Sequence, residues 1–289
     1  MSIVISWSEI DAYRQCPFKH QLAYVERWSK PHFEGPLARG SWWHRVLEAH
    51  YSAIQRAGLN KRSGRDWADA AVDLVFSDMR MVDAPDLDLI QWMYAGYLDL
   101  YGYDPGWGIL AVEHTAEIPL NTDFTMKVKM DLVVRDQAGL IWLIDHKSGA
   151  NLPSKRDLDF DDQFGLYVWA LRKMGRKVHG VIYGAARTKR NKVKEQPLEE
   201  RFSRTLMVRT DTELDTIARE TLQTAYSMYD VARGHISRGQ IDAERHPDTD
   251  RCKWRCDFTE ACLLGRKTDN YRTRLFLQET GFERDHTRH

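Results

Sequence analysis

The sequence predicts an α/β protein with a mixed central sheet of four or five strands flanked by helices. Short runs rich in Val, Ile, Leu and Met predict the strands, and apolar residues repeated three or four positions apart predict the helices. Because the two kinds of segment alternate along the chain, we expect one layered core. Predicted strands cover residues 110–120, 126–134, 140–147, 178–186 and 202–208, and the main predicted helices cover 41–58, 67–79, 89–101, 158–174 and 212–234.

The segment of residues 126–149 predicts a β-hairpin at the centre of this sheet. Two apolar runs flank a polar loop that ends in Gly139, which is typical of a hairpin connection. If the loop is centred near Gln137-Ala138, Asp131 on the first strand lies opposite Asp145 on the second. Side chains alternate between the faces of a strand, so Lys147 shares the face of Asp145.

The two opposed carboxylates predict a bound cation. Like charges that face each other destabilise a sheet, and acids are rarely buried unless they are paired or bound to metal. Taken singly, each acid is better explained as the end of a strand. The pair favours an oxygen-ligand site for Mg²⁺ or Mn²⁺, with Lys147 placed to hold a water or a phosphate oxygen beside the metal.

Composition limits the class of protein. The 289 residues suffice for one large domain, and 42 basic residues balance 42 acidic ones, so nucleic-acid binding would require a local basic patch. No apolar run reaches the length of about 20 residues that a membrane span needs. The N-terminus lacks the basic flank of a secretion signal. We expect a cytoplasmic protein with a single domain over residues 1–265 and a polar tail over residues 266–289.

The four cysteines predict a metal centre that joins distant parts of the chain. Cys16 stands near the start, and Cys252, Cys256 and Cys262 form a C-x3-C-x5-C cluster near the end. Disulfides do not suit a cytosolic protein. Zinc and an iron–sulfur cluster both take four thiolates, and unpaired cysteines are the third interpretation. A link from residue 16 to residue 252 would restrict the unfolded chain by about 4–5 kcal/mol in the entropy model.

Three further groups of polar residues are candidates for the site. His44 lies on the helix that opens a helical insertion over about residues 45–107, although a helical histidine is more often structural than a ligand. Glu113 is either a further oxygen ligand or an exposed strand residue, and we favour the exposed residue. Gln163 and Tyr167 meet one turn apart on the helix predicted over residues 158–174, with Phe160 on its apolar face.

The most basic run of the chain follows the strand of residues 178–186. It includes Arg187, Lys189, Arg190 and Lys192. Such a run beside a metal site would bind phosphates. The alternative is a solvated loop, which is the usual fate of a charge run.

Taken in order, these residues resemble the PD-(D/E)XK nuclease superfamily, and within it the RecB/AddB-like branch that includes CRISPR-associated exonucleases. Asp131 and Asp145-His146-Lys147 resemble the D…(D/E)-x-K motif. Gln163 and Tyr167 resemble the branch's Q-x3-Y helix, and the G-x3-H segment ending at His44 resembles its early histidine. One cysteine before the core and three after it resemble the branch's iron–sulfur staple. The chain departs from the family by Asp145, where many members carry Glu, and by three residues between the first two late cysteines, where two are usual.

The resemblance implies a restriction-endonuclease-like fold and a metal-dependent DNA exonuclease, acting on single strands, of the kind used in repair and recombination. His44, Asp131, Asp145 and the backbone carbonyl of His146 would hold Mg²⁺ or Mn²⁺, and Lys147 would orient or deprotonate the attacking water. Gln163 and Tyr167 would position the DNA backbone. The resemblance also implies a structural 4Fe–4S cluster on Cys16, Cys252, Cys256 and Cys262, with zinc as the alternative occupant, in a protein of prokaryotic or phage origin.

Two other functions fit parts of the pattern. A nuclease-like fold that only binds DNA would serve as a recombination or CRISPR-adaptation partner, and an Asp131→Ala cleavage assay separates it from an enzyme. A zinc-stabilised helical binding protein would be colourless, whereas an iron–sulfur protein is brown. Hydrolase chemistry based on serine or cysteine has little support, because the chain has no G-x-S-x-G motif and the cysteines are better explained as ligands.

Overall fold

The computed structural model describes residues 2–29, 35–57, 62–82, 84–191, 194, 196–237, 242–264 and 272–273. The contacts divide the chain into two compact units. The first contains Met1–Phe33, Glu117–Lys127 and Thr216–His289, and the second contains Glu34–Ala116 and Val128–Asp215. None of the described helices is long and apolar enough to cross a membrane.

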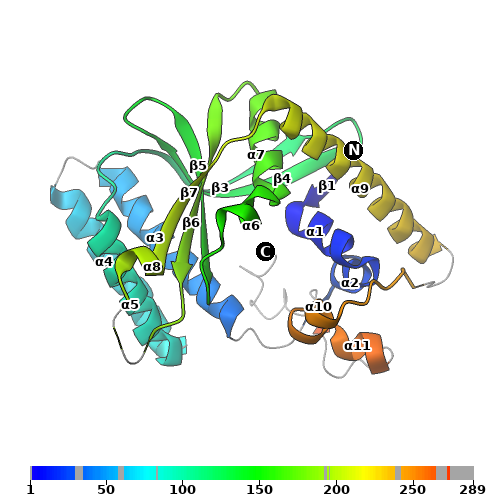
Figure 1. Cartoon of the computed structure of the whole chain (residues 1–289), viewed down its shortest axis with the longest axis horizontal. Coiled ribbons are helices and arrows are strands. Elements are labelled where there is room, and N and C mark those ends of the chain that lie inside the picture. The colour runs from blue at the N-terminus through cyan, green and yellow to red at the C-terminus, as the bar shows by residue number, and fades with distance from the viewer. Residues whose placement is uncertain are drawn as a thin grey trace. The chain divides into compact units, whose positions relative to one another are not determined.

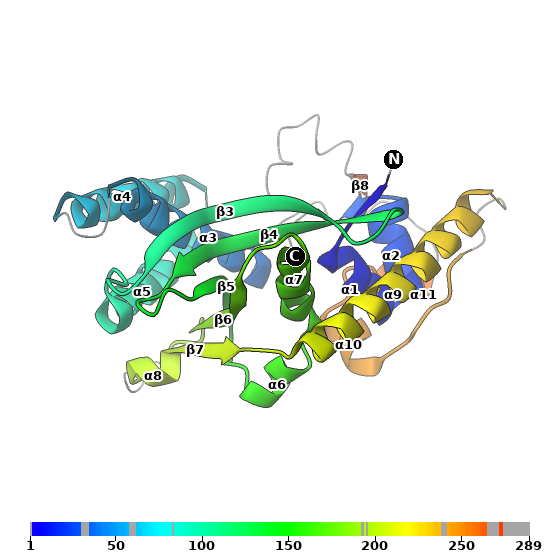
Figure 2. The ribbon, with the colours of Figure 1, turned by 90° about the horizontal axis from the view of Figure 1, so that it is seen from above.

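The second unit is built on a mixed sheet flanked by helices, which confirms the predicted fold class (Figure 1). Its strands are β3 (Gly108–Pro119), β4 (Phe124–Arg135), β5 (Ile141–Gly149), β6 (Val178–Arg187) and β7 (Phe202–Met207). β4 pairs antiparallel with β5, β5 pairs parallel with β6, and β6 pairs antiparallel with β7. β3 pairs with β4 and runs alongside it (Figure 2).

The hairpin between β4 and β5 has the predicted register. Val133 pairs with Leu143 and Leu132 with Ile144, so the next position along places Asp131 opposite Asp145. Gly139 adopts a φ of +83° in the connecting loop, a conformation that glycine reaches without strain. The hairpin therefore aligns the two acids as the alternating pattern requires.

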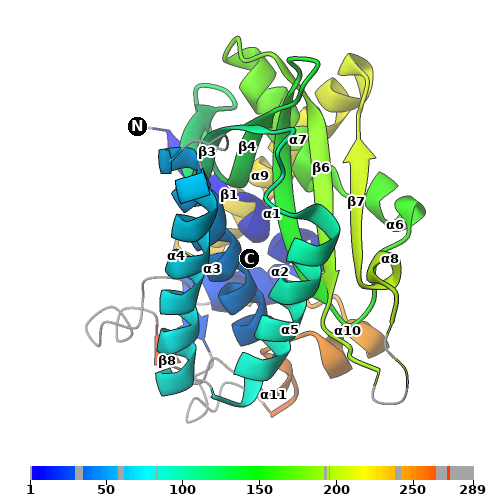
Figure 3. The ribbon, with the colours of Figure 1, turned by 90° about the vertical axis from the view of Figure 1, so that its left-hand side faces the viewer.

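A layer of helices covers one face of this sheet (Figure 3). It consists of α3 (Pro36–Ala57), α4 (Arg62–Val82) and α5 (Ala84–Tyr101). Trp43, Leu47 and Tyr51 of α3 are almost fully buried, in a core that also contains Leu132 and Ile144 from the sheet. The burial of these apolar side chains is the main force that holds the layer on the strands. We call this the back face of the sheet.

On the opposite face of the sheet, which we call the front face, a predicted helix is interrupted. The helix predicted over residues 158–174 is two helices, α6 (Lys155–Asp159) and α7 (Asp162–Lys173). Asp161 caps α7 by accepting a hydrogen bond from the Gln163 N–H, and a capping box at Ser154 starts α6. Phe160 therefore lies between the helices and is exposed, not on a buried helix face as predicted.

The remaining elements of the second unit connect these layers. Gly175, with a φ of +77°, follows α7 and ends it where the sequence predicts. The short helix α8 (Leu198–Arg201) precedes β7. Its Arg201 is buried and lies with its guanidinium carbon 3.8 Å from the ring centroid of Trp92 on α5.

The first unit joins the two ends of the chain. Its elements are β1 (Ile3–Ser6), α1 (Trp7–Gln15), α2 (Pro17–His20), the π-helix η1 (Gln21–Val25), β2 (Trp28–Ser29), most of α9 (Asp211–Ser237), α10 (Thr249–Trp254), α11 (Thr259–Leu264) and β8 (Arg272–Thr273). β1 pairs in parallel with the first residues of β4. Phe18 and Leu22 pack with Phe258 in one apolar cluster. The polar tail predicted from residue 266 lies outside the described residues, apart from β8.

Candidate active site

Asp131, Asp145 and Lys147 converge on the front face of the hairpin. Asp131 Oδ2 accepts a hydrogen bond of 2.8 Å from the His146 backbone N–H. Lys147 Nζ lies 3.1 Å from Asp145 Oδ1 and 3.0 Å from Oδ2. Only the contact with Oδ1 has hydrogen-bond geometry, so the buried Oδ2 accepts no hydrogen bond in this structure. A buried carboxylate oxygen without a donor is available to a cation.

His44 reaches the same site from α3. Its Nδ1 atom lies 3.4 Å from Asp131 Oδ2 and 3.9 Å from Glu113 Oε1. The ligand atoms of His44, Glu113 and Asp131 all lie within 4.8 Å of one another. One ion could therefore contact a nitrogen and two carboxylate oxygens from three separate elements.

Glu113 is the residue that the sequence analysis misjudged. We expected an exposed strand residue, but only 12 % of the Glu113 side chain is exposed, and it forms an ion pair with Lys129 of β4. Its φ of +47° lies in the left-handed region, which is rare for a residue other than glycine. The strand is irregular at this point, so strict alternation does not give the direction of the side chain. The sequence carries no signal of this irregularity.

The pKa values of the two aspartates are shifted in opposite directions by their surroundings. Burial raises the pKa of Asp145 to about 6, with Lys147 opposing the shift and Asp131 adding to it. Burial acts in the same sense on Asp131, but the neighbouring His44 and Lys147 outweigh it and hold the pKa of Asp131 well below its usual value. Burial would lower the pKa of His44, yet the Asp131 carboxylate raises it on balance. Asp131 is thus ionised over the whole physiological range.

The donor set fits a hard divalent cation. Carboxylate oxygens are the ligands that Mg²⁺ and Mn²⁺ prefer, and an imidazole nitrogen is acceptable to Mn²⁺. Burial raises the pKa of Glu113, and Asp131 adds to this shift because the two acids are close. A cation between these carboxylates would relieve their repulsion.

Gln163 and Tyr167 lie on α7, as predicted, and contact each other. Gln163 Nε2 donates a hydrogen bond of 3.1 Å to Tyr167 Oη. Burial raises the pKa of Tyr167 to about 12, and Asp145, among other groups of the site, adds to the shift. The phenol of Tyr167 is therefore close enough to the aspartates for their charge to raise its pKa. It stays protonated at neutral pH and can donate a hydrogen bond.

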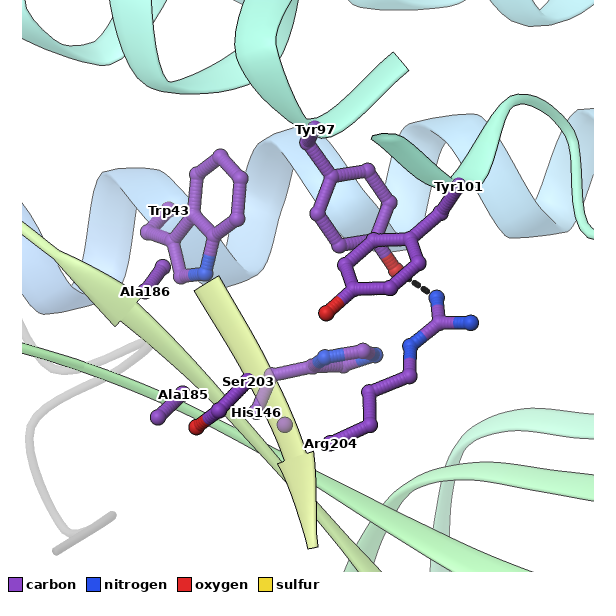
Figure 4. Close-up of a pocket in the computed structure, with 9 residues that line it drawn as sticks. Trp43, Tyr97, Tyr101, His146, Ala185, Ala186, Ser203 and Arg204 are labelled. Carbon is purple, nitrogen blue, oxygen red and sulfur yellow. Dashed lines mark hydrogen bonds between the residues drawn. The ribbon is translucent and has the colours of Figure 1, made fainter. Parts of the chain in front are cut away.

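His146 turns its ring away from the site. The imidazole lies on the back face, stacked on Tyr51 with 5.9 Å between ring centroids. Burial lowers the pKa of His146 to about 3, so the ring is neutral. Figure 4 shows it beside a cavity lined by Tyr97, Tyr101 and Arg204. The front face of this residue consists only of its backbone, whose N–H fixes Asp131.

A buried ion pair supports His146 from behind. Arg204 donates hydrogen bonds to Asp104 Oδ2 at 2.8 Å and to Tyr97 Oη at 2.8 Å. Tyr51 donates to the same Asp104 carboxylate at 2.5 Å. The guanidinium also lies 3.6 Å from the ring centroid of Tyr101. This network connects α3, α5 and β7 behind the strand that carries the site.

The four cysteines are free thiols of the first unit. Cys16, Cys256 and Cys262 pack against the same apolar cluster as Phe18. Backbone N–H groups of His246 and Asp248 donate to the sulfurs of Cys16 and Cys252, each over 3.4 Å. Burial raises the pKa of the Cys256 thiol, with smaller contributions from Cys252 and Cys16. The structure thus gathers the cysteines that the sequence separates.

The predicted DNA-binding residues are only partly described. Arg187 donates to the carbonyl of Ala150 over 3.1 Å, and Arg190 pairs with Asp88 over 2.9 Å. Lys189 follows β6 and is exposed. Lys192 lies outside the described residues.

Comparison with known proteins identifies the family. The sequence pattern of the PD-(D/E)XK nuclease superfamily matches residues 4–263, and the chain belongs to this superfamily. No curated protein gives a significant match. A candidate exonuclease from Eubacterium rectale aligns with 13 % identity over 86 % of this chain and 87 % of its own, with a TM-score of 0.49.

Two more solved structures align less well. The protein SSO0001 aligns with 14 % identity over 89 % of this chain and 96 % of its own, with a TM-score of 0.35. LHK-Exo, solved in complex with dAMP, aligns with 13 % identity over 69 % of this chain and 99 % of its own, with a TM-score of 0.29.

Proposed function

We propose that this protein is a Mg²⁺- or Mn²⁺-dependent deoxyribonuclease that digests DNA from its ends, with single-stranded DNA as its substrate. The observation that carries the proposal is the convergence of His44, Asp131, Asp145 and Lys147 at one place in a chain of this superfamily. Metal-assisted hydrolysis of a phosphodiester uses a cation that polarises the phosphate and a group that orients the water, and these side chains can provide a site for both.

His44, Asp131 and Asp145 would hold the metal, with the backbone carbonyl of His146 as a further ligand. Glu113 joins this set because its carboxylate lies beside His44 and Asp131. A divalent ion held there would polarise the scissile phosphate and lower the pKa of a bound water.

Lys147 orients the reacting oxygens. Burial would lower the pKa of Lys147, but Asp145 and Asp131 raise it above its usual value. Without a metal the ammonium group is therefore protonated at neutral pH, and Lys147 would orient the attacking water as a hydrogen-bond donor. Such a fixed charge stabilises the negative charge that develops on the phosphate. Gln163 would position the DNA backbone, and Tyr167, which is buried, would hold the Gln163 side chain in place.

A 4Fe–4S cluster on Cys16, Cys252, Cys256 and Cys262 would have a structural role. Zinc is the alternative occupant of the same four thiolates. Backbone N–H groups directed at the sulfurs are common around iron–sulfur centres. The basic segment around Arg187, Lys189 and Arg190 would bind phosphates of the substrate.

Degradation of end-labelled DNA tests the function. Wild-type protein with Mg²⁺ or Mn²⁺ is expected to release nucleotides from single-stranded DNA, with EDTA and Asp131→Ala each stopping the reaction. Stable binding of DNA without cleavage under any metal would contradict the proposal and favour the DNA-binding partner. Cleavage of RNA alone would contradict the choice of substrate.

A further inference from the structure

Phe160 is the most exposed of the large apolar side chains in the described part of the chain. It is 79 % exposed, in the short connection between α6 and α7. Single exposed apolar residues are common on protein surfaces, so exposure alone indicates nothing. Two further features of the structure distinguish Phe160 from an ordinary surface residue.

The first feature is a rigid backbone on both sides of the ring. Arg209 Nη2 donates hydrogen bonds to the carbonyl of Asp159 over 2.8 Å and to the carbonyl of Asp161 over 3.0 Å. The side chain of Asp161 accepts from the Gln163 N–H over 3.0 Å. The Asp161 N–H also donates to the Leu158 carbonyl over 3.0 Å. The peptide groups before and after Phe160 are thus both held, and the ring is presented to solvent at low entropic cost.

The second feature is the position of Phe160 next to the candidate active site. Asp145 pairs in register with Tyr183 on β6. Phe164 of α7 packs on the Tyr183 ring with 5.7 Å between centroids. The first turn of α7 therefore lies over the strand positions that carry the site, and Phe160 precedes this turn in the chain.

We propose that Phe160 is a stacking platform for a nucleobase of the substrate strand, and that it selects single-stranded DNA. This inference rests on the proposed function. The neighbouring carboxylates Asp159 and Asp161 would repel a phosphate, so the neutral ring face of a base suits this place. Bases in a duplex are already stacked on their neighbours, whereas bases of a single strand are free to stack on an aromatic side chain.

Steady-state digestion tests the role of the ring. Phe160→Ala is expected to raise KM for a single-stranded oligonucleotide about 10-fold, the usual effect of one lost base stack, with kcat within about twofold of wild type. Phe160→Trp is expected to retain the wild-type KM. Leu74→Ala is the matched control, because Leu74 is 71 % exposed on α4 of the same unit. An unchanged KM in Phe160→Ala would overturn the inference and leave the nuclease function intact.

Binding without cleavage provides the second measurement. Oligonucleotides that carry the fluorescent base 2-aminopurine, each at a different position, are titrated with protein in EDTA. Stacking on Phe160 is expected to quench the fluorescence of the base at one position with the wild type and not with Phe160→Ala. An abasic nucleotide at that position is expected to weaken wild-type binding as much as Phe160→Ala does, with no further loss when the two are combined. Additive losses would overturn the inference. Absence of DNA binding and cleavage in the wild type would instead contradict the proposed function itself.

Discussion

At the scale of single residues, the same side chain acquires different properties from its surroundings. Asp131 and Asp145 face each other across one hairpin, yet the pKa of Asp131 is lowered and that of Asp145 is raised. The difference follows from the contacts, since His44 adjoins Asp131 while one oxygen of Asp145 has no hydrogen-bond donor. A pair of acids with separated pKa values is a recognised mark of a functional site.

Asp131→Asn is expected to reduce nuclease activity on the order of 100-fold at saturating DNA, because a charge that would stabilise the metal is lost. The amide oxygen can still accept the His146 N–H, so the fold is expected to survive. Asp136→Asn is the matched control, because Asp136 lies in the same hairpin and accepts the Trp142 indole N–H over 2.9 Å. Activity measured against Mg²⁺ concentration, together with circular dichroism, checks both. Equal activities in the two variants would contradict the assignment of Asp131.

His50 gives the protein a stability that depends on pH. It is fully buried, and burial, together with the charge of Arg204, lowers its pKa to about 4. A depressed folded-state pKa means that the unfolded chain binds more protons between pH 6.5 and pH 4, so stability is complete above pH 6.5 and is lost as the pH falls. Between pH 7 and pH 5 the expected loss from His50 is about 2 kcal/mol.

Urea unfolding at both pH values, in wild type and His50→Phe, measures this contribution. The variant is expected to lose about 2 kcal/mol less than the wild type on acidification. The buried His146, which acts in the same sense, is present in both proteins and cancels in the difference. Identical losses in the two proteins would show that His50 is not held neutral.

At the scale of elements, sequence patterns correctly predict the strands and turns that are determined by neighbouring residues. The strand at residues 178–186 and the hairpin of β4 and β5 are predicted because their apolar runs and their turn are continuous in the sequence. Gly175 correctly marks the end of α7. The break between α6 and α7 is missed, because Phe160 fits the helical period and only the capping roles of Ser154 and Asp161 reveal the second helix.

Sequence patterns do not predict the contacts between residues that are far apart in the chain. Glu113 joins His44 and Asp131 through an irregular strand, and Arg204 joins Asp104 across 100 positions of the sequence. Both depend on the register of several elements at once. The site motifs were accessible because Asp131, Asp145 and Lys147 lie on one hairpin, whose geometry follows from a short segment.

The ion pair of Arg204 and Asp104 is expected to hold α5 and β7 together. Arg204→Met leaves the Asp104 carboxylate buried without its cation, so the free energy of unfolding is expected to fall by about 3–5 kcal/mol. The control is Arg190→Met, because the pair of Arg190 and Asp88 is exposed and worth about 0–1 kcal/mol. Chemical denaturation measures both. A smaller loss in Arg204→Met than in Arg190→Met would contradict the role of this pair.

At the scale of the whole chain, one compact unit contains all four cysteines, from segments near both ends of the sequence. Cys16 precedes α2, and Cys252, Cys256 and Cys262 lie on or beside α10 and α11. Loss of a link that closes so long a loop is expected to weaken folding by several kcal/mol, about 4–5 in the entropy model.

Anaerobically purified protein is expected to be brown and to contain iron, and Cys16→Ser is expected to lose the colour and to melt at a lower temperature. His246→Ala is the control, because the interaction of residue 246 with the Cys16 sulfur uses the backbone N–H and survives the substitution. Iron analysis and visible absorption check the result. A colourless wild-type protein that contains zinc would contradict the cluster.

The proposed nuclease activity depends on a divalent ion held by the two opposed aspartates. Crystals soaked in Mn²⁺ and measured for anomalous scattering locate such an ion without reference to activity. The predicted result is one strong peak within bonding distance of Asp131 and Asp145, beside His44, which disappears in Asp131→Asn. A peak only at the other cluster of candidate ligands, Glu26, His235 and Asp242, or no peak in this part of the structure, would contradict the assignment of the active site.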